Sequence, residues 1–186
     1  MVELTALWLP VLLSAVFVFV ASSILHMVLP LHRGDYQKLP DEDKIVAAMR
    51  AAGVPPGNYH FPHCNSPKEM GTPEMMEKLK AGPVGLLNVI PSGPPNMGKF
   101  LGQWMLFCLL MGVFVAYLTG RTLGPGAHYL AVFRVAGTAA FIGYGLGCIP
   151  DSIWKGQRWG TTARHMFDGL IYALLTAGTF GWLWPR

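Results

Sequence analysis

The sequence predicts an all-α membrane protein of four transmembrane helices, with an ordered cytoplasmic cap between the first and the second helix. Three observations predict this class: long stretches without charge, tryptophans near the ends of those stretches, and an uneven distribution of Lys and Arg. Of the 186 residues, 52% are hydrophobic and only 13% are charged, whereas charged residues make up about 25% of an average soluble domain. We therefore expect a single membrane domain over residues 1–186.

Four runs of the chain carry no charged residue: 4–25, 100–120, 135–150 and 169–185. A hydrocarbon core of about 30 Å requires about 20 helical residues. The third run reaches this length when it starts at Tyr129, and the fourth when it starts near Thr162 and includes Asp168. We therefore expect transmembrane helices at 5–28, 100–120, 129–149 and 162–184. A cleaved signal peptide is the alternative for the first run, but no basic residue precedes it.

The six tryptophans divide equally between the two ends of these expected helices. One group belongs to the end with the chain termini and consists of Trp8, Trp182 and Trp184. The other group belongs to the opposite end and consists of Trp104, Trp154 and Trp159. This distribution is typical of the aromatic belts at the two membrane–water interfaces.

The two sides of the expected membrane differ in their basic residues. The short loop 151–161 contains Lys155 and Arg158, and the loop 30–99 on the same side contains eight Lys and Arg residues. The positive-inside rule therefore places both loops in the cytoplasm and both termini outside. We expect a bacterial inner membrane protein. The net charge of +4 follows this topology and does not indicate a nucleic-acid partner.

The loop 30–99 is expected to form an ordered cap, because proline–glycine turns divide it. Residues 41–53 predict a short helix with acidic residues in its first turn and Gly53 at its end. Residues 72–82 predict a second helix, with Thr72 as the N-cap. Residues 84–90 predict either a short extended segment or a segment on the membrane surface.

Small residues recur at every fourth position in the third and fourth expected helices. They are Ala139, Gly143 and Gly147 in one helix, and Gly169, Ala173, Ala177 and Gly181 in the other. Such ladders allow helix backbones to approach closely in lipid. We expect close packing of these two helices as an antiparallel hairpin, and contact of one ladder with a partner chain is the alternative.

The segment YHFPHC, residues 59–64, is a candidate metal site with His60, His63 and Cys64 as ligands. A structural zinc site requires four ligands, usually in two pairs, and the second pair is absent here. His26 and His32 could complete the site only if the cap folds back on the first helix. We favour a turn fixed by proline, with the imidazoles bonded to the backbone. The cap methionines suit Cu(I), but they form no repeated motif.

His26 and His165 lie at the same expected membrane depth, near the cytoplasmic ends of the first and fourth helices. Two histidines at facing depths in a helix bundle can be the axial ligands of a haem. Binding of a haem between them is therefore one hypothesis. The alternative is that both are interfacial histidines that bond to loop carbonyl groups.

Two charged residues, Arg134 and Asp168, lie within the expected spans, and each is costly in a bilayer. Arg134 lies toward the outer side and Asp168 toward the inner side, so a direct ion pair is not expected. Three residues on the same helix are nearer candidates as partners of Asp168: Arg164, His165 and Tyr172. We favour a structural cluster at the inner interface, and handling of a proton or a ligand is the alternative.

Five segments together resemble a family of small, uncharacterised bacterial inner-membrane proteins. They are HRGDYQKLPDED, PPGNYHFPH, GPVGLLNVIPSGPPNMGKFLGQW, IPDSIWKGQRW and DGLIYALLTAGTFGWLWP. The resemblance covers most of the chain. It implies a multi-pass membrane protein and carries no activity that can be transferred.

The sequence contains no Walker loop and no GxSxG, HExxH or GxGxxG motif, so enzymatic activity is not favoured. We expect a non-catalytic accessory, assembly or stabilising subunit of a larger membrane complex, without a cofactor. Its partners would be lipid and other membrane-protein subunits or further copies of the chain. The alternative is a metal-, haem- or quinone-binding membrane redox protein. An oligomeric transporter or channel is a weaker alternative, because few polar groups lie within the expected spans.

Overall fold

The computed structural model describes all residues from Met1 to Arg186 and divides them into two compact units. The first, which we call the bundle unit, comprises Met1–Tyr36, Asn96–Ile153 and Gln157–Arg186. The second, which we call the hairpin unit, comprises Gln37–Pro95 and Trp154–Gly156. Each unit is described by itself.

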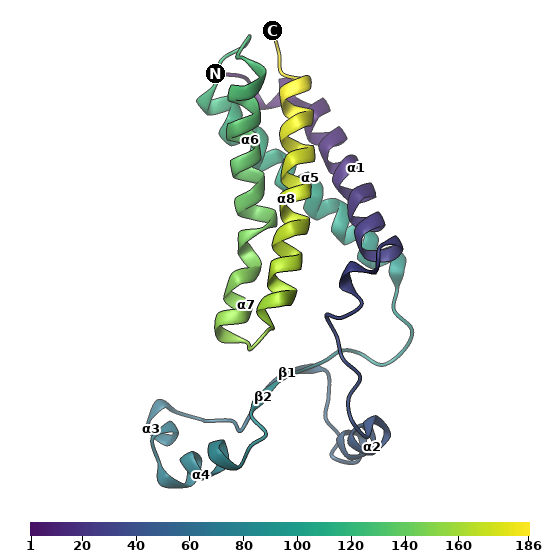
Figure 1. Cartoon of the computed structure of the whole chain (residues 1–186), viewed down its shortest axis with the longest axis vertical. Helices are drawn as coiled ribbons and strands as arrows, with labels where there is room; N and C mark the ends of the chain where they lie inside the picture. Colours follow the sequence, from purple (N-terminus) through teal and green to yellow (C-terminus); the bar gives the residue numbers. More distant parts are fainter. The chain divides into compact units, whose positions relative to one another are not determined.

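The bundle unit consists of four long helices, and Figure 1 shows them packed together. They are α1 (Trp8–Ser23), α5 (Met97–Thr122), α6 (Tyr129–Tyr144) and α8 (Trp159–Trp182). Helix α8 packs along α6 and also contacts α1, while α5 contacts α1 and α6. A short helix, α7 (Ile149–Trp154), follows α6 after one 3-10 turn.

Three segments of the bundle unit are long and apolar enough to cross a membrane: Leu4–Val28, Met97–Thr122 and Tyr129–Trp154. They support the prediction of a membrane protein built from transmembrane helices. The expected fourth span corresponds to α8, which is not among them. Its first turns carry Arg164, His165 and Asp168, which lower its hydropathy below that of the other three.

The α8 ladder brings this helix into close contact with α6, as predicted, but the residues it meets are Gly137 and, at the end of α6, Gly145 rather than the predicted ladder of Ala139, Gly143 and Gly147. A Cβ atom on Gly143 would meet Met111 of α5 instead. A Cβ atom on Gly137 would lie 3.1 Å from Cβ of Ala177. A Cβ atom on Gly169 would overlap with the backbone of Gly145. The hairpin therefore depends on glycine at Gly169, because any side chain there would separate the two helices.

Both chain ends lie at the same end of the bundle unit (Figure 1). The Val2 amide donates a hydrogen bond to the Gly120 carbonyl at 2.8 Å, and the Gly126 amide donates one to the Pro185 carbonyl at 2.9 Å. The indole of Trp184 is buried and donates to the Gly124 carbonyl at 2.9 Å. The assignment of this end to the outside of the cell stays a prediction.

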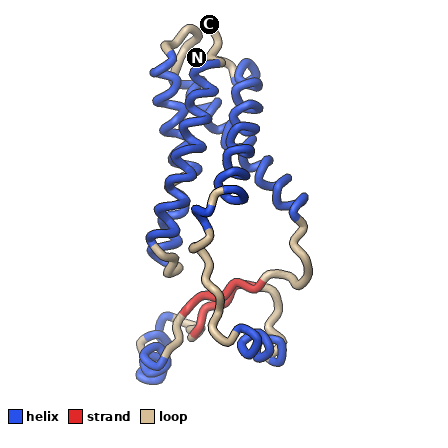
Figure 2. Tube along the Cα trace, turned by 45° about the vertical axis from the view of Figure 1, so that its right-hand side comes forward, coloured by secondary structure: helices blue, strands red, loops and turns tan.

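The hairpin unit contains the two strands of the protein, drawn in red in Figure 2. Strand β1 (Gly57–Phe61) pairs antiparallel with β2 (Gly85–Val89), and Tyr59 lies opposite Leu87. The extended form expected for 84–90 is therefore confirmed. The partner strand was not predicted, because YHFPHC indicates only an extended residue before Pro62.

Three short helices accompany the strands: α2 (Glu42–Ala51), α3 (Pro67–Met70) and α4 (Pro73–Ala81). Two of them confirm the helices expected at 41–53 and 72–82. The Thr72 hydroxyl accepts a hydrogen bond from the Met75 amide at 3.3 Å, as an N-cap residue does. Helix α4 ends at Gly82, whose positive φ of 59° favours glycine.

Candidate metal centre

Four potential metal ligands meet where α1 ends and α8 begins: His26, His32, His165 and Asp168. One ligand atom from each residue lies within 4.8 Å of the corresponding atom of every other. In a tetrahedral site with bonds of 2.0–2.2 Å, ligand atoms are about 3.4 Å apart. The four side chains thus form a slightly expanded coordination sphere, and all of them belong to the bundle unit.

Two of these ligands lie in the segment that follows α1, where the regular α-helix is replaced by a π turn and a 3-10 turn. The segment Ile24–Val28 forms a wider π turn that carries His26, and such turns are frequent at functional sites. After an extended Leu29, the segment Pro30–His32 forms a 3-10 turn that presents His32. The imidazole rings of His26 and His32 are stacked, with centroids 4.2 Å apart and an interplanar angle of 8°.

Helix α8 supplies the other two ligands from one face. His165 and Asp168 are three residues apart, so their side chains lie on neighbouring turns. The ring of His165 stacks on that of His32 with centroids 5.5 Å apart. The Asp168 side chain is only 3% exposed. A buried carboxylate therefore faces three imidazoles.

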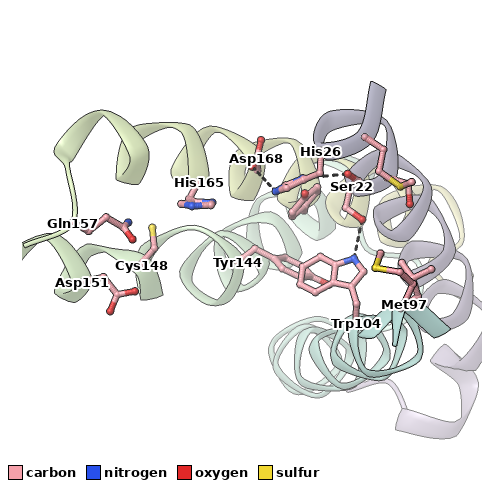
Figure 3. A pocket seen from close by; sticks show the side chains of 14 residues that line it. Ser22, His26, Met97, Trp104, Tyr144, Cys148, Asp151, Gln157, His165 and Asp168 are labelled. Atoms are coloured by element: carbon pink, nitrogen blue, oxygen red, sulfur yellow. Dashed lines mark hydrogen bonds and ion pairs between the residues drawn. The ribbon is translucent and has the colours of Figure 1, made fainter. Parts of the chain in front are cut away.

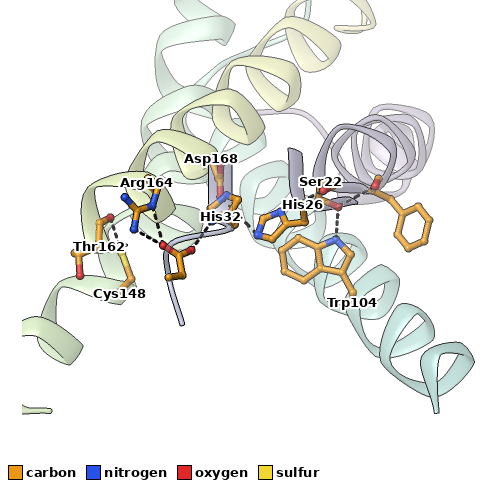
Figure 4. Close-up of polar contacts among 10 residues, drawn as sticks. Ser22, His26, His32, Trp104, Cys148, Thr162, Arg164 and Asp168 are labelled. Carbon is orange, nitrogen blue, oxygen red and sulfur yellow. Dashed lines mark hydrogen bonds and ion pairs between the residues drawn. The ribbon is translucent and has the colours of Figure 1, made fainter. Parts of the chain in front are cut away.

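Hydrogen bonds fix the orientation of two of the histidines, as Figure 4 shows. Nδ1 of His32 lies 2.6 Å from Oδ2 of Asp35, and Nδ1 of His26 lies 3.2 Å from the Ser22 carbonyl oxygen. A carboxylate and a carbonyl can only accept, so Nδ1 carries the proton in both rings. In the neutral form of each ring, Nε2 then carries the lone pair, which is the arrangement that second-shell acceptors impose on metal-bound histidine.

Both Nε2 atoms lie close to the same carboxylate oxygen. Oδ2 of Asp168 is 2.9 Å from Nε2 of His32 and 3.7 Å from Nε2 of His26. Neither oxygen of Asp168 has a hydrogen-bond partner, and neither does Nε2 of His32. Burial of a charged group without a partner is costly. A cation between these atoms would satisfy them all.

Asp35 forms the outer shell of the centre. Its side chain is 5% exposed, and its Oδ1 accepts from Nε of Arg164 at 2.7 Å and also from Nη2. Burial raises the pKa of Asp35, but the hydrogen bonds with His32 and Arg164 and the charge of Arg164 lower it below the usual value. Asp35 is therefore a carboxylate that orients His32.

The partners of Arg164 and Asp168 differ from those expected from the sequence. Arg164 pairs with Asp35 rather than with Asp168, and it also donates to the Thr161 hydroxyl at 3.2 Å. Asp168 faces histidines from the end of α1. Tyr172 lies one turn after Asp168, and its buried hydroxyl has no partner. The i−4 spacing that suggested an Arg164–Asp168 pair is thus overridden by a contact across 129 residues.

A cavity of about 550 Å³ adjoins the centre within the bundle unit (Figure 3). His26, His165 and Asp168 line one part of it. The rings of Trp104 and Tyr172 line another part, with centroids 6.0 Å apart in an edge-on arrangement. The coordination sphere is therefore accessible from a largely apolar cavity.

The other predicted site residues do not join this centre. His60 lies in β1, where its Nδ1 is 3.0 Å from the Pro62 carbonyl oxygen. His63 is exposed and Cys64 is a free thiol. These three residues form no group of three clustered ligands, and His32, considered as their possible partner, lies in the bundle centre instead. Arg134 lines a separate groove between α5 and α6.

Comparison with known proteins gives no relative for this chain. No family model, no curated protein and no solved structure matches it. The interpretation of the centre therefore rests on its own geometry. The sequence had singled out His26, His165 and Asp168, whereas the roles of His32 and Asp35 were missed, because they depend on the turn after α1.

Proposed function

We propose that the chain is a multi-pass inner-membrane protein that binds one divalent transition-metal ion through His26, His32, His165 and Asp168. The observation that carries this proposal is the buried Asp168 carboxylate, which faces three imidazoles and has no hydrogen-bond partner. In water-filled surface clusters such groups bond to solvent, but here the carboxylate is enclosed. A bound cation supplies the missing partner.

Three nitrogen ligands and one carboxylate define the class of metal. Imidazole suits Zn²⁺, Fe²⁺, Ni²⁺ and Cu²⁺, whereas Mg²⁺ and Ca²⁺ prefer oxygen ligands. No thiolate takes part, which disfavours Cu(I). The charge of the Arg164 guanidinium is balanced by Asp35. Arg164 therefore does not neutralise the Asp168 carboxylate, and the proposed metal ion does so. Four protein ligands fill a tetrahedral site, so a water or ligand oxygen would bind as a fifth ligand, a coordination number that Zn²⁺ reaches in catalytic sites.

Haem is less compatible with the arrangement. The ring of His32 stacks on both His26 and His165. A macrocycle held by His26 and His165 would have to take the place of that ring. The bis-histidine hypothesis is therefore disfavoured relative to a single metal ion.

A fourth membrane span by α8 is part of this proposal. Its 24 residues extend about 36 Å at 1.5 Å per residue, which exceeds a hydrocarbon core of about 30 Å. Asp168, the acidic residue of α8, faces the other helices rather than lipid. Intramembrane charged groups that face a bundle interior are usually functional.

A docking role in a larger membrane complex is the second candidate function. The segment Gln37–Pro95 belongs to a compact unit of its own. It exposes apolar side chains of both helix and strand, including Ile45, Val84, Leu86 and Ile90. This role is compatible with metal binding in the bundle unit.

The proposal is tested by equilibrium dialysis of the full chain, purified in mild detergent, against Zn²⁺. We expect one ion per chain, lost in the double variant His32→Ala/Asp168→Asn. The variant His60→Ala/His63→Ala is the matched control, because it also removes two potential metal ligands but leaves the bundle unit unchanged. Equal zinc binding by wild type and His32→Ala/Asp168→Asn would overturn the proposal.

A further inference from the structure

The cavity beside the metal ligands combines an apolar aromatic wall with a single group of unsatisfied polar atoms. Trp104, Tyr144 and Tyr172 form a continuous chain of edge-on ring contacts along this wall. The centroids of Tyr144 and Tyr172 are 5.6 Å apart, with an interplanar angle of 77°. Such walls favour flat, apolar ligands, which stack on them or meet their ring edges.

The polar atoms that lack partners lie at the metal side of the cavity. The Tyr172 hydroxyl is buried and unpaired, and it follows Asp168 by one helical turn. Trp104 is different, because its Nε1 already donates to the Ser22 hydroxyl at 2.8 Å. The cavity wall therefore carries one unpaired hydroxyl, on the residue one helical turn after the ligand Asp168, and this hydroxyl is the available donor to an atom bound at the metal.

The border of the cavity is apolar and exposed. Met27, Met97 and Leu101 line it, with exposed fractions of 73%, 51% and 37%. These side chains belong to segments that are candidate membrane spans. A ligand that enters past them is one that dissolves in lipid. A volume of about 550 Å³ is in the range of sites for drug-sized molecules.

We infer that this cavity binds a lipid-soluble phenol or quinol, whose oxygen coordinates the metal ion and accepts a hydrogen bond from Tyr172. The inference rests on the proposed metal site and names the ligand class of that same site. The ring of the ligand lies against Trp104 and Tyr144, and its apolar substituent extends toward Met27 and Leu101. Tyr172 is a positioning residue in this account.

The test uses the full chain loaded with Co²⁺, whose visible absorption reports its ligands. The probe is 4-butylphenol, and butylbenzene, which has the same apolar body without the oxygen, is the matched ligand control. We expect 4-butylphenol to change the Co²⁺ spectrum in a saturable manner and butylbenzene to leave it unchanged. The phenol should bind at least about tenfold more tightly with the metal than without it.

The variant Tyr172→Phe tests the hydroxyl. Loss of one hydrogen bond should weaken phenol binding about three- to tenfold, with the Co²⁺ content unchanged. The control is Tyr117→Phe, because Tyr117 on α5 is half-exposed and does not line the cavity.

Each remaining outcome identifies what has failed. A chain that binds one Co²⁺ ion and shows no spectral change with 4-butylphenol overturns this inference and leaves the metal proposal standing. Equal binding of both probes without a change in the Co²⁺ spectrum also overturns it, and indicates that the cavity holds its ligand through apolar contacts alone. A chain that binds no Co²⁺ overturns the metal proposal and this inference together.

Discussion

Nε2 of His32 lies 2.9 Å from Oδ2 of Asp168, yet neither atom makes a hydrogen bond. The opposite nitrogen of His32 is engaged with Asp35 at 2.6 Å. When His32 is neutral with its proton on Nδ1, the Nε2 lone pair and the carboxylate face the same small space. This is the arrangement expected around a cation, and the two groups would repel each other without one.

Replacement of the carboxylate separates metal binding from folding. In Asp168→Asn we expect the zinc affinity to fall at least about 100-fold, because the anionic ligand is lost. The metal-free variant should be at least as stable as metal-free wild type, since a buried unpaired charge has been removed. Thermal unfolding in excess chelator measures the second effect. A large loss of stability in chelator would instead indicate that His32 is protonated and ion-paired with Asp168.

The outer-shell carboxylate should matter almost as much as a ligand. Asp35→Asn is expected to weaken zinc binding about 10- to 100-fold, because second-shell partners orient the ligating histidine. The control is Asp41→Asn, which removes an exposed carboxylate paired with Lys44 at 3.0 Å. Calorimetric titration of both variants with Zn²⁺ measures the affinities. Equal affinities would contradict the role given to Asp35.

Zinc should stabilise the native protein by mass action. At a free concentration of 100 times Kd, bound zinc adds about 2.7 kcal/mol to the free energy of unfolding. For a chain of this length that corresponds to a rise in Tm of about 5–10 °C. We expect His60→Ala/His63→Ala to retain the rise and His26→Ala/His32→Ala to lose it. The reverse pattern would move the site to the YHFPHC segment.

The contact between α6 and α8 predicts a strong effect of one methyl group. Gly169→Ala places Cβ against the Gly145 backbone, so we expect a loss of about 2 kcal/mol or more in stability. Gly102→Ala is the matched control, because this glycine also lies within a helix and a Cβ there meets nothing within 4 Å. It should be neutral or raise stability by up to about 1 kcal/mol. Thermal unfolding of the two variants in the same detergent provides the comparison, and similar Tm values would argue against the helix contact.

The proposed four spans predict that Gly93 lies on the cytoplasmic side of the membrane and Arg186 on the outer side. Alkaline phosphatase requires disulfides, which form outside the cytoplasm. A fusion after Arg186 should therefore be active, and a fusion after Gly93 should be inactive. Activity of the Gly93 fusion alone would reverse the topology. Equal behaviour of the two fusions would indicate three spans, because without a crossing by α8 both positions lie on the same side.

The sequence was sufficient to predict where the long helices lie, but it predicted only some of the residues of the metal centre. Uncharged runs predicted the long helices, and Thr72 and Gly82 predicted the bounds of α4. Residues His26 and His165 could be placed at one end of the bundle because both lie at the same expected depth. The pairing of Arg164 with Asp35 could not be predicted, because local spacing favoured Asp168 and the true partner is 129 residues away.

The most direct test of the central claim is X-ray absorption at the zinc edge of the zinc-loaded full chain. The bundle centre predicts a shell of nitrogen and oxygen only, at about 2.0–2.2 Å, with the outer scattering of imidazole. Sulfur at about 2.3 Å would contradict the account. It would place the metal at a thiolate, with Cys64 of the YHFPHC segment as the candidate ligand.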